Sequence, residues 1–414
     1  MTDRLFLDAL DLCARKLLED EPTLGVNFPY VTAPSGAWVT MPASFSAGYR
    51  GASWSHGNWF CGFWVGLLLV AFLRTGDENY LQLADQRLLL VAPRAADGNT
   101  HNIGFIFYPS AIAAYHITGE KRYADLALRA AEQLRRRLIM TPRGSYISSW
   151  GPLDDERGRR SSAIDTMANL PLLYWAGQYD RDASFILAAE AHAVMTRAAF
   201  IRPDHSTYHA VEYDLATGKR QRGFTFQGYS DESCWPRGQG WAIYGYVRTA
   251  EATGKREYLD LAETLADYYL RRTGPDLIPF WDFDDPKIPD APRDSSASAI
   301  VAAALLDLAA LHPDEQKAAQ WHQKALDMLT ALCRHYLATE PSHRGLLKQG
   351  CYSKPHNEGV ASAVMFGDFF FVEALCSAVM PGKLREAPSR LTAPTMSSTV
   401  ARPVPHGAAQ STSG

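Results

Sequence analysis

A chain of 414 residues with 47% hydrophobic and 21% charged residues has the composition of a globular protein and is long enough to bury a large core. The formal net charge is only −4, so no global field favours nucleic acid or an anionic membrane, and neither partner is expected. The longest apolar run, residues 64–72, is too short to span a bilayer.

The amino-terminal segment MTDRLFLDALDLCARKLLEDE alternates apolar and charged residues at helical spacing and lacks a continuous apolar core. This pattern predicts an amphipathic helix rather than a signal peptide, and therefore a cytoplasmic protein. The six cysteines include no CxxC pair, so neither a zinc site nor a disulfide framework is indicated. We expect buried, reduced thiols and no metal or other cofactor.

Helical periodicity continues to about residue 380 and predicts about twelve helices. In chain order the predicted ranges are 5–18, 63–73, 80–91, 106–117, 123–138, 167–178, 184–200, 241–252, 258–272, 297–311, 318–336 and 364–379. Strand-like alternation is confined to short pieces between helices, such as GSYISSW (144–150) and STYHAVEYD (206–214). Residues 381–414 are rich in Pro, Ser, Thr, Ala and Gly without a periodic apolar face, which predicts a disordered tail.

A weak internal repeat indicates how the helices are connected. The repeated segments are TGDENY (75–80), TGEKRY (118–123) and TGKREY (253–258). In each, the glycine is suited to end one helix in a left-handed conformation, and the tyrosine is placed to pack the next. Tight hairpins on one side and long links on the other predict an all-α (α/α)6 barrel over residues 1–380, with an open solenoid as the alternative.

The long links collect aromatic and polar side chains. The aromatic ones include Trp59, Trp150, Trp235 and Trp241, and the polar ones His209, Gln227 and Arg237. Aromatic faces beside amide groups and a guanidinium suit a sugar that carries a carboxylate. For any single tryptophan, packing in the core is the more common role.

Three further features have structural explanations that compete with functional ones. Asp165, in AIDTMANLP, is placed to cap a helix, and considered alone capping is favoured over catalysis. Asp294, in RDSSASAI, has the same appearance. His205 and His209 have HxxxH spacing, but their segment reads as extended, which would hold the two rings too far apart to share one metal ion.

The ordered motifs together resemble those of the unsaturated glucuronyl hydrolases, glycoside hydrolases with an (α/α)6-barrel fold. The motifs are GFWVG, HNIGF, SYISSW, AIDTMANLP, QGYSDESCWPRGQGW, RDSSASAI and GCYS followed by FGDFFFVEAL. The resemblance covers about residues 1–380. It implies removal of a 4,5-unsaturated uronic acid from the non-reducing end of oligosaccharides produced by polysaccharide lyases.

The implied reaction is hydration of a vinyl ether: an acid protonates C4, water adds at C5, and the hemiketal then opens. One carboxyl group therefore serves as acid and then as base. By motif, Asp165 matches the catalytic Asp of the family. The implied binding residues are Trp59, Trp150, Trp235 and Trp241 as platform and walls, with His209, Gln227 and Arg237 as polar contacts.

Two positions depart from the family pattern. Asn102, in HNIGF, stands where a second Asp is usual, which predicts an enzyme impaired by nature or by design. The loop that reads S-x-x-S-x-K in members acting on sulfated substrates is SKPHNE here: it keeps Ser353 as a binding residue but places Glu358 at the Lys position. A carboxylate would repel a sulfate, so unsulfated oligosaccharides are the expected partners.

Two other functional classes stay open at this point. A sugar isomerase or epimerase could use the same barrel, with histidines on its loops as proton shuttles. A catalytically silent sugar-binding protein is the other alternative, because Asn102 lacks the carboxylate of its counterpart without disturbing the aromatic residues.

Overall fold

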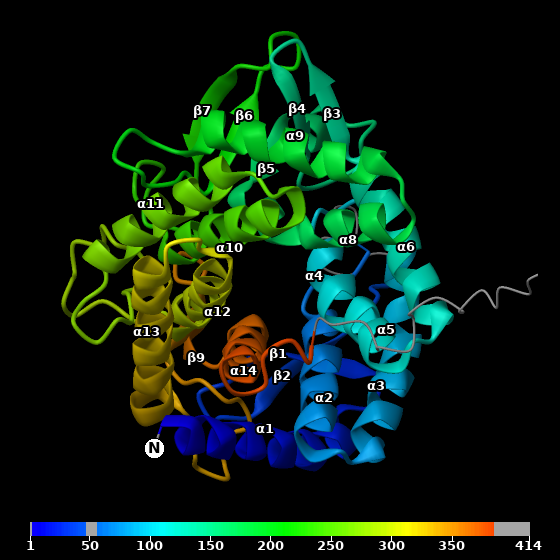
Figure 1. Cartoon of the computed structure of the whole chain (residues 1–414), viewed down its shortest axis with the longest axis vertical. Helices are drawn as coiled ribbons and strands as arrows, with labels where there is room; N and C mark the ends of the chain where they lie inside the picture. Colours follow the sequence, from blue (N-terminus) through cyan, green and yellow to red (C-terminus); the bar gives the residue numbers. More distant parts are fainter. Residues whose placement is uncertain (1, 47–55, 385–414) are drawn as a thin grey trace, which may run out of the picture.

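Two concentric rings of helices make up the computed structural model, which describes residues 2–46 and 56–384 (Figure 1). The inner ring contains α2 (Cys61–Thr75), α4 and α5 (Ile103–Phe107 and Ala113–Thr118), α8 (Pro171–Tyr179), α10 (Pro236–Thr253), α12 (Ser295–Leu311) and α14 (Met365–Val379). The outer ring contains α1 (Thr2–Leu24), α3 (Glu78–Val91), α6 (Lys121–Arg136), α9 (Ala183–Phe200), α11 (Arg256–Arg272) and α13 (Glu315–Ala331). The predicted tail began at residue 381; residues 381–384 form a turn, and residues 385–414 lie outside the described residues.

Side-chain patterning explains which helices are inside. α12 reads SSASAIVAAALLDLAAL and is buried on nearly all sides, whereas α6 buries one face and carries Arg and Lys on the other. The ring closes where α14 packs on α2: the rings of Phe63 and Phe369 are 5.1 Å apart, and a Cβ on Gly66 would lie 2.5 Å from Phe369. Contact between the first and last inner helices confirms a closed barrel over an open solenoid.

The three TG repeats form the tight hairpins that the sequence predicts. Gly76, Gly119 and Gly254 end their helices with φ values of 72°, 73° and 67°, a region that L-residues with a Cβ rarely adopt. The tyrosine that follows each glycine is buried, and its hydroxyl donates a hydrogen bond to an oxygen of another helix. These links close one end of the barrel.

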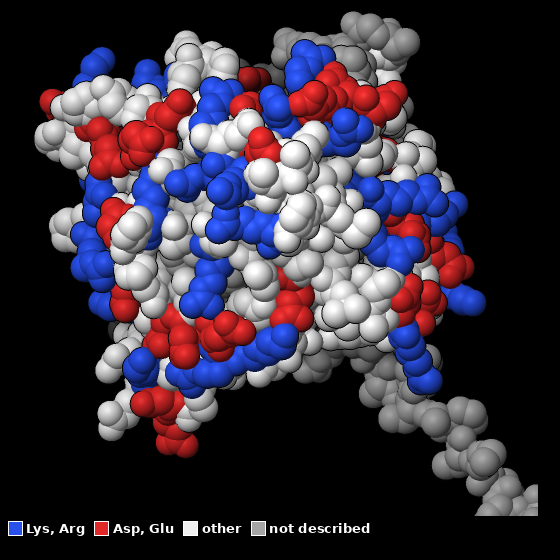
Figure 2. Space-filling view, turned by 90° about the horizontal axis from the view of Figure 1, so that it is seen from above, with Lys and Arg blue, Asp and Glu red and all other residues white. Residues whose placement is uncertain are grey.

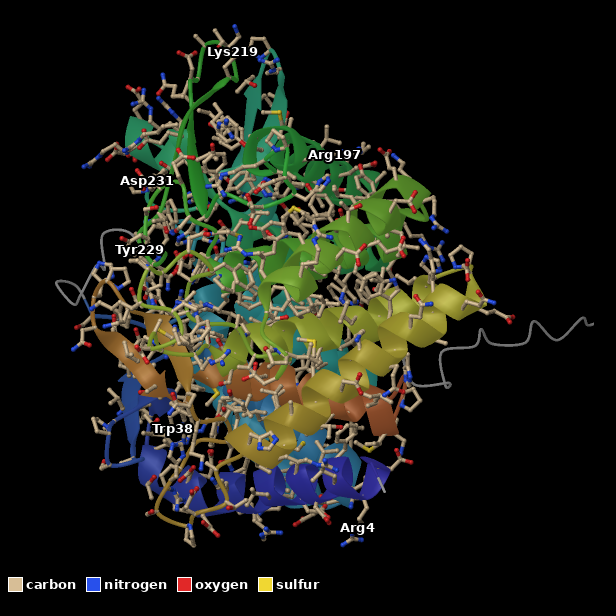
Figure 3. All side chains as sticks on the ribbon, turned by 90° about the vertical axis from the view of Figure 1, so that its left-hand side faces the viewer. Arg4, Trp38, Arg197, Lys219, Tyr229 and Asp231 are labelled. Atoms are coloured by element: carbon tan, nitrogen blue, oxygen red, sulfur yellow. The ribbon has the colours of Figure 1, made fainter. Side chains whose placement is uncertain are left out.

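Short antiparallel strands gather at the opposite end, here named the open end. They are β1 (Asn27–Thr32) with β2 (Trp38–Pro42), β3 (Leu138–Thr141) with β4 (Gly144–Ile147), β5 (Ser161–Ala163) with β6 (Ala210–Tyr213) and β7 (Arg220–Phe224), and β8 (Gly350–Ser353) with β9 (Glu358–Ser362). Figure 3 shows Trp38, Tyr229 and Asp231 at the open end and Arg4 toward the other.

Several helix boundaries differ from their predicted positions, and three helices illustrate the differences. The helix expected over 106–117 begins at Ile103 and contains a π-helical turn, Tyr108–Ile112. The helix expected over 167–178 divides into a 3₁₀ helix, Ile164–Asn169, and α8. α10 begins at Pro236 rather than at 241, because proline is well suited to the first helical position.

The structure also bears on the expectations for the cysteines, for membrane-spanning segments and for surface charge. All six cysteines are free and buried, as predicted. Among the described residues, no helix is long and apolar enough to cross a membrane. Figure 2 shows basic and acidic side chains interspersed on the face seen from above, so neither sign dominates this side of the molecule.

Candidate active site

Asp165 lies in the first turn of the 3₁₀ helix Ile164–Asn169, just after β5, in the link that leads to the inner helix α8. The capping interpretation is wrong, because Ala163 occupies the N-cap position and Asp165 is already inside the helix. The Asp165 side chain is 15% exposed, and its Oδ2 atom is buried without a hydrogen-bond partner among the described residues. A carboxyl group with an unsatisfied oxygen is available for a ligand.

The electrostatic surroundings of Asp165 keep it protonated more readily than an ordinary aspartate. Burial raises its pKa from 3.8 to about 6, and the positive charge of Arg237 opposes part of that rise. The nearest basic group is His209, whose Nε2 lies 3.8 Å from Asp165 Oδ2. Burial lowers the pKa of His209 well below 6.5, so the imidazole is neutral near pH 7. Asp165 therefore holds and releases a proton in the weakly acidic range.

His209 is held by a hydrogen bond and by two aromatic rings. Its Nδ1 atom bonds Thr225 Oγ1 at 2.9 Å, and its ring lies 4.3 Å from that of Trp235 and 4.1 Å from that of Phe226. Its Nε2 atom is buried without a partner in the described structure. The imidazole is thus fixed in orientation, with one nitrogen left for a ligand.

Asn169 ties the start of α4, which follows Asn102, to the segment that carries Asp165. The Asn169 side chain accepts a hydrogen bond from the backbone N–H of Phe105 at 2.7 Å and donates one to the Asp165 carbonyl at 3.0 Å. Gly104 permits this approach, since a Cβ there would lie 2.5 Å from the Asn169 carbonyl oxygen. Asn102 itself occupies the N-cap position of α4, and its side chain makes no capping hydrogen bond.

The four predicted tryptophans differ in exposure. Trp59 is partly buried and stacks on Phe366 at 5.5 Å, while Trp150 is partly buried with its edge toward Phe226 at 5.2 Å. Trp235 is 3% exposed and Trp241 is fully buried. Trp241 was predicted on a long link, but it lies inside α10 because that helix starts earlier than expected. Its indole N–H is nevertheless buried without a partner among the described groups.

Arg237 and Gln227 both hold the backbone of β8. The Arg237 guanidinium lies between the rings of Trp235 and Phe366, at 4.4 and 4.8 Å. One nitrogen donates to Asp294 at 2.7 Å and to the Cys351 carbonyl at 2.5 Å, and the other donates to the Tyr352 carbonyl at 2.6 Å. The Gln227 amide donates to the same Tyr352 carbonyl at 2.9 Å. Their predicted contacts with substrate stay predictions.

Asp294 caps α12 as predicted, accepting a hydrogen bond from Ser296 N–H at 3.2 Å, and its ion pair with Arg237 adds a second role.

Ser353 Oγ lies 2.8 Å from His356 Nδ1 at the turn between β8 and β9. Glu358 accepts a hydrogen bond from the Tyr30 hydroxyl at 2.6 Å. The charge of Glu358 is therefore fixed in place by a residue of β1.

Two residues of the site were not selected from the sequence. His101 is buried, its Nδ1 lies 2.8 Å from the Ser149 carbonyl, and its Nε2 has no partner among the described residues. Burial lowers the pKa of His101 to about 3. Phe226 contacts both His209 and Trp150. In the sequence, these two residues could have been identified only by their neighbours: His101 precedes Asn102, and Phe226 precedes Gln227.

The buried polar atoms without a hydrogen-bond partner among the described residues include those of His101, Asp165, His209 and Trp241. Such atoms are uncommon in folded proteins, and each is available to a polar ligand or to a water molecule. The described residues include no group of three His, Cys, Asp or Glu side chains that could hold a metal ion. A proton-carrying carboxyl among aromatic rings and neutral imidazoles, at the open end of a helical barrel, suits acid–base chemistry on a carbohydrate.

Comparisons with known proteins identify the family. The model of Glycosyl Hydrolase Family 88 matches residues 44–380. The unsaturated glucuronyl hydrolase of Bacillus sp. is 33% identical over 373 residues, which cover 89% of this chain and 94% of that protein. The unsaturated chondroitin disaccharide hydrolase of Streptococcus pneumoniae is 32% identical, over 77% of this chain and 81% of that protein. The chain belongs to Glycosyl Hydrolase Family 88.

The solved structures agree with this assignment. The crystal structure of the unsaturated glucuronyl hydrolase from Bacillus sp. GL1, described as responsible for the degradation of glycosaminoglycan, superposes with a TM-score of 0.80 at 31% identity. It covers 93% of this chain and 99% of that one. The predicted helical-barrel fold, the family resemblance and the glycoside hydrolase class are confirmed.

Proposed function

We propose that this enzyme removes a 4,5-unsaturated uronic acid from the non-reducing end of an oligosaccharide by hydrating its C4=C5 double bond. The observation that carries the proposal is the raised pKa of Asp165 beside an unpaired, neutral His209. In ordinary glycosidases one carboxylic acid protonates the leaving oxygen while a second carboxylate acts on the other face. Hydration of a vinyl ether needs only one such group.

Asp165 supplies the proton in this scheme. Its O–H proton is transferred to C4, and the electron pair of the double bond forms the new C–H bond. Water then adds to C5 and returns a proton to the Asp165 carboxylate, so the carboxyl group is regenerated. The resulting hemiketal opens and releases the rest of the oligosaccharide. A pKa of about 6 suits a group that must both give and regain a proton.

Asn102 lowers the efficiency of this step. A carboxylate at position 102 would raise the pKa of Asp165 further through like-charge repulsion. An amide keeps the shape and the hydrogen-bonding capacity of aspartate but contributes no charge. Substrate binding is therefore retained, while proton delivery is weaker at neutral pH.

Unsulfated oligosaccharides are the proposed substrate class. The turn from Ser353 to Glu358 carries an anion fixed by the Tyr30 hydroxyl, and a fixed carboxylate repels a sulfate group. The relatives are named for glucuronyl and chondroitin disaccharide substrates, which supports an unsaturated uronate at the first position.

A direct test uses an unsaturated disaccharide and follows the absorbance of its double bond. Loss of absorbance together with release of the second sugar supports hydration. Unchanged absorbance with measurable binding would contradict it, as would conversion of a saturated sugar into its isomer.

A silent sugar-binding protein is the second candidate, and Asn102 is the observation that favours it. The two functions separate cleanly, because only the enzyme consumes the double bond. The binding residues proposed for both are the same.

A further inference from the structure

The loop Thr225–Trp235 connects β7 to α10 and is closed by its own hydrogen bonds. Thr225 Oγ1 accepts the Gly228 N–H at 2.8 Å, and Asp231 accepts the Thr225 N–H at 2.8 Å. Ser233 Oγ accepts the Ser230 N–H at 3.0 Å. Since these bonds span the loop, its shape is fixed before any ligand arrives.

A second set of hydrogen bonds anchors this loop from outside. Asp282 Oδ2 accepts hydrogen bonds from the Tyr229 N–H and from the Ser233 hydroxyl, each at 2.8 Å. Asp284 accepts one from the Cys234 N–H at 2.8 Å. Asp282 is buried, so the contact is not weakened by solvent. The backbone at Tyr229 is therefore held rigidly although its side chain is on the surface.

The loop presents aromatic side chains both inward and outward. Trp235 is buried against His209, whereas Phe226 is 37% exposed and Tyr229 is 50% exposed. Among the large hydrophobic side chains of the described residues, these two are the exposed aromatic ones. They stand three residues apart on one loop, and Figure 3 shows Tyr229 at the open end. Phe226 also contacts Trp150 and His209, so this member of the pair borders the candidate active site.

We propose that Phe226 and Tyr229 form an outer subsite that binds a neutral sugar ring beyond the first two sugars, the unsaturated uronic acid and its neighbour. The apolar face of a pyranose stacks on an aromatic ring, and a ring on a rigid loop loses little conformational freedom on binding. The subsite rests on the proposed function for the identity of the first sugar. Because of this subsite, oligosaccharides longer than a disaccharide should bind with higher affinity than the disaccharide.

The charge of the loop Thr225–Trp235 indicates which class of sugar can bind at the outer subsite. Asp231 and Glu232 are both exposed, and they follow Tyr229 by two and three residues on the loop. Carboxylates at this point disfavour a uronate or a sulfated sugar, because like charges that face each other reduce affinity. Neutral hexoses or N-acetylhexosamines are the expected occupants.

The test measures binding of an unsaturated disaccharide and of an unsaturated tetrasaccharide whose remaining sugars are neutral. Calorimetry in an Asp165→Asn background prevents consumption of either ligand. Tyr229→Ala is expected to weaken tetrasaccharide binding about three- to tenfold, the range of a lost aromatic contact, with the loss confined to the longer ligand. Tyr229→Phe keeps the ring and should bind within about twofold of the parent. Met140→Ala, at an exposed position on β3, is the control for removing a surface side chain.

Each outcome bears on a different part of the proposal. Equal affinities for both ligands in the parent, or an unchanged tetrasaccharide affinity in Tyr229→Ala, would overturn the outer subsite. A tetrasaccharide carrying a sulfate or carboxylate on its inner sugars that bound as tightly as the neutral one would overturn the assigned sugar class. Loss of the double bond is measured separately, with the enzyme that retains Asp165. No loss, with the Tyr229 effect intact, would refute the hydration and leave the subsite standing.

Discussion

The two ends of the barrel are built on the same inner helices, but they differ in whether their buried polar groups have hydrogen-bond partners. At the hairpin end, glycine turns are short, and the tyrosine hydroxyls beside them are paired. At the open end, long links carry buried polar atoms without partners, including Asp165 Oδ2 and His209 Nε2. Buried polar groups without partners lower the free energy of unfolding, so the open end is less stable than it would be if these groups were paired. The same groups are the ones available for chemistry. Stability and activity should therefore respond to different substitutions.

The largest effect is expected at Asp165. Asp165→Asn removes the group that gives and regains a proton, so the hydration rate should fall about 10²- to 10⁴-fold. Binding of the unsaturated disaccharide should stay within about tenfold, because the amide keeps the shape of the side chain. The measurements are initial rates of double-bond loss and calorimetric affinity. Substantial remaining turnover would make another group, such as His209, the acid.

A change of opposite sign is expected at position 102. Asn102→Asp places a second anion near Asp165, raises the pKa of that carboxyl above about 6, and should increase the rate roughly a hundredfold. Since the acid must be protonated, activity declines as pH rises through this pKa, and the variant should keep its activity to higher pH. Rates are compared from pH 4.5 to 8. Identical profiles would refute the charge argument.

The stability of the open end should depend on pH through Asp165. Its folded pKa of about 6 lies above the ordinary 3.8, so its favourable contribution is complete below 3.8 and is lost as pH rises through 6. Asn does not titrate, and Asp165→Asn should therefore be more stable than the parent at pH 8 by up to about 3 kcal/mol. Urea unfolding at pH 4.5 and 8 checks this. A difference that does not grow with pH would argue against burial as the cause.

The smallest effect is expected at the hairpin end. Gly254 has a φ of 67°, and no atom lies within 4 Å of the Cβ that another residue would add. Gly254→Ala should therefore lower the free energy of unfolding by about 1 kcal/mol through backbone strain alone and leave the hydration rate unchanged. Gly254→Asn is the matched control, since asparagine tolerates this conformation better. An activity loss in a stable Gly254→Ala protein would mean that the two ends are coupled.

Local patterns were sufficient to predict most of the barrel. Periodic burial marked the inner and outer helices, and Gly76, Gly119 and Gly254 marked the hairpins because their conformation is determined within a few residues. Boundaries were less certain where proline begins a helix, as at Pro171 and Pro236. Each of these features depends on neighbours in the chain.

The site was predictable only in part, because its interactions connect distant segments. Asp165 has the sequence context of a helix cap, and only the fold shows it buried beside His209. Arg237 meets Asp294 and the carbonyls of β8, more than fifty residues away, which no local pattern indicates. Family resemblance pointed to segments that the fold brings to the open end, but it gave neither the burial of Trp241 nor the hydrogen bond between Tyr30 and Glu358.

One amide joins the two chemically important segments. Asn169 holds the start of α4 through Phe105 and the 3₁₀ helix through the Asp165 carbonyl. Through these two hydrogen bonds, the segments that carry positions 102 and 165 are mechanically coupled. Such mechanical coupling allows the charge at position 102 to be exchanged without rebuilding the backbone. If position 102 acts as proposed, a single side chain sets the catalytic strength of this barrel without any change in the loops that would select the substrate.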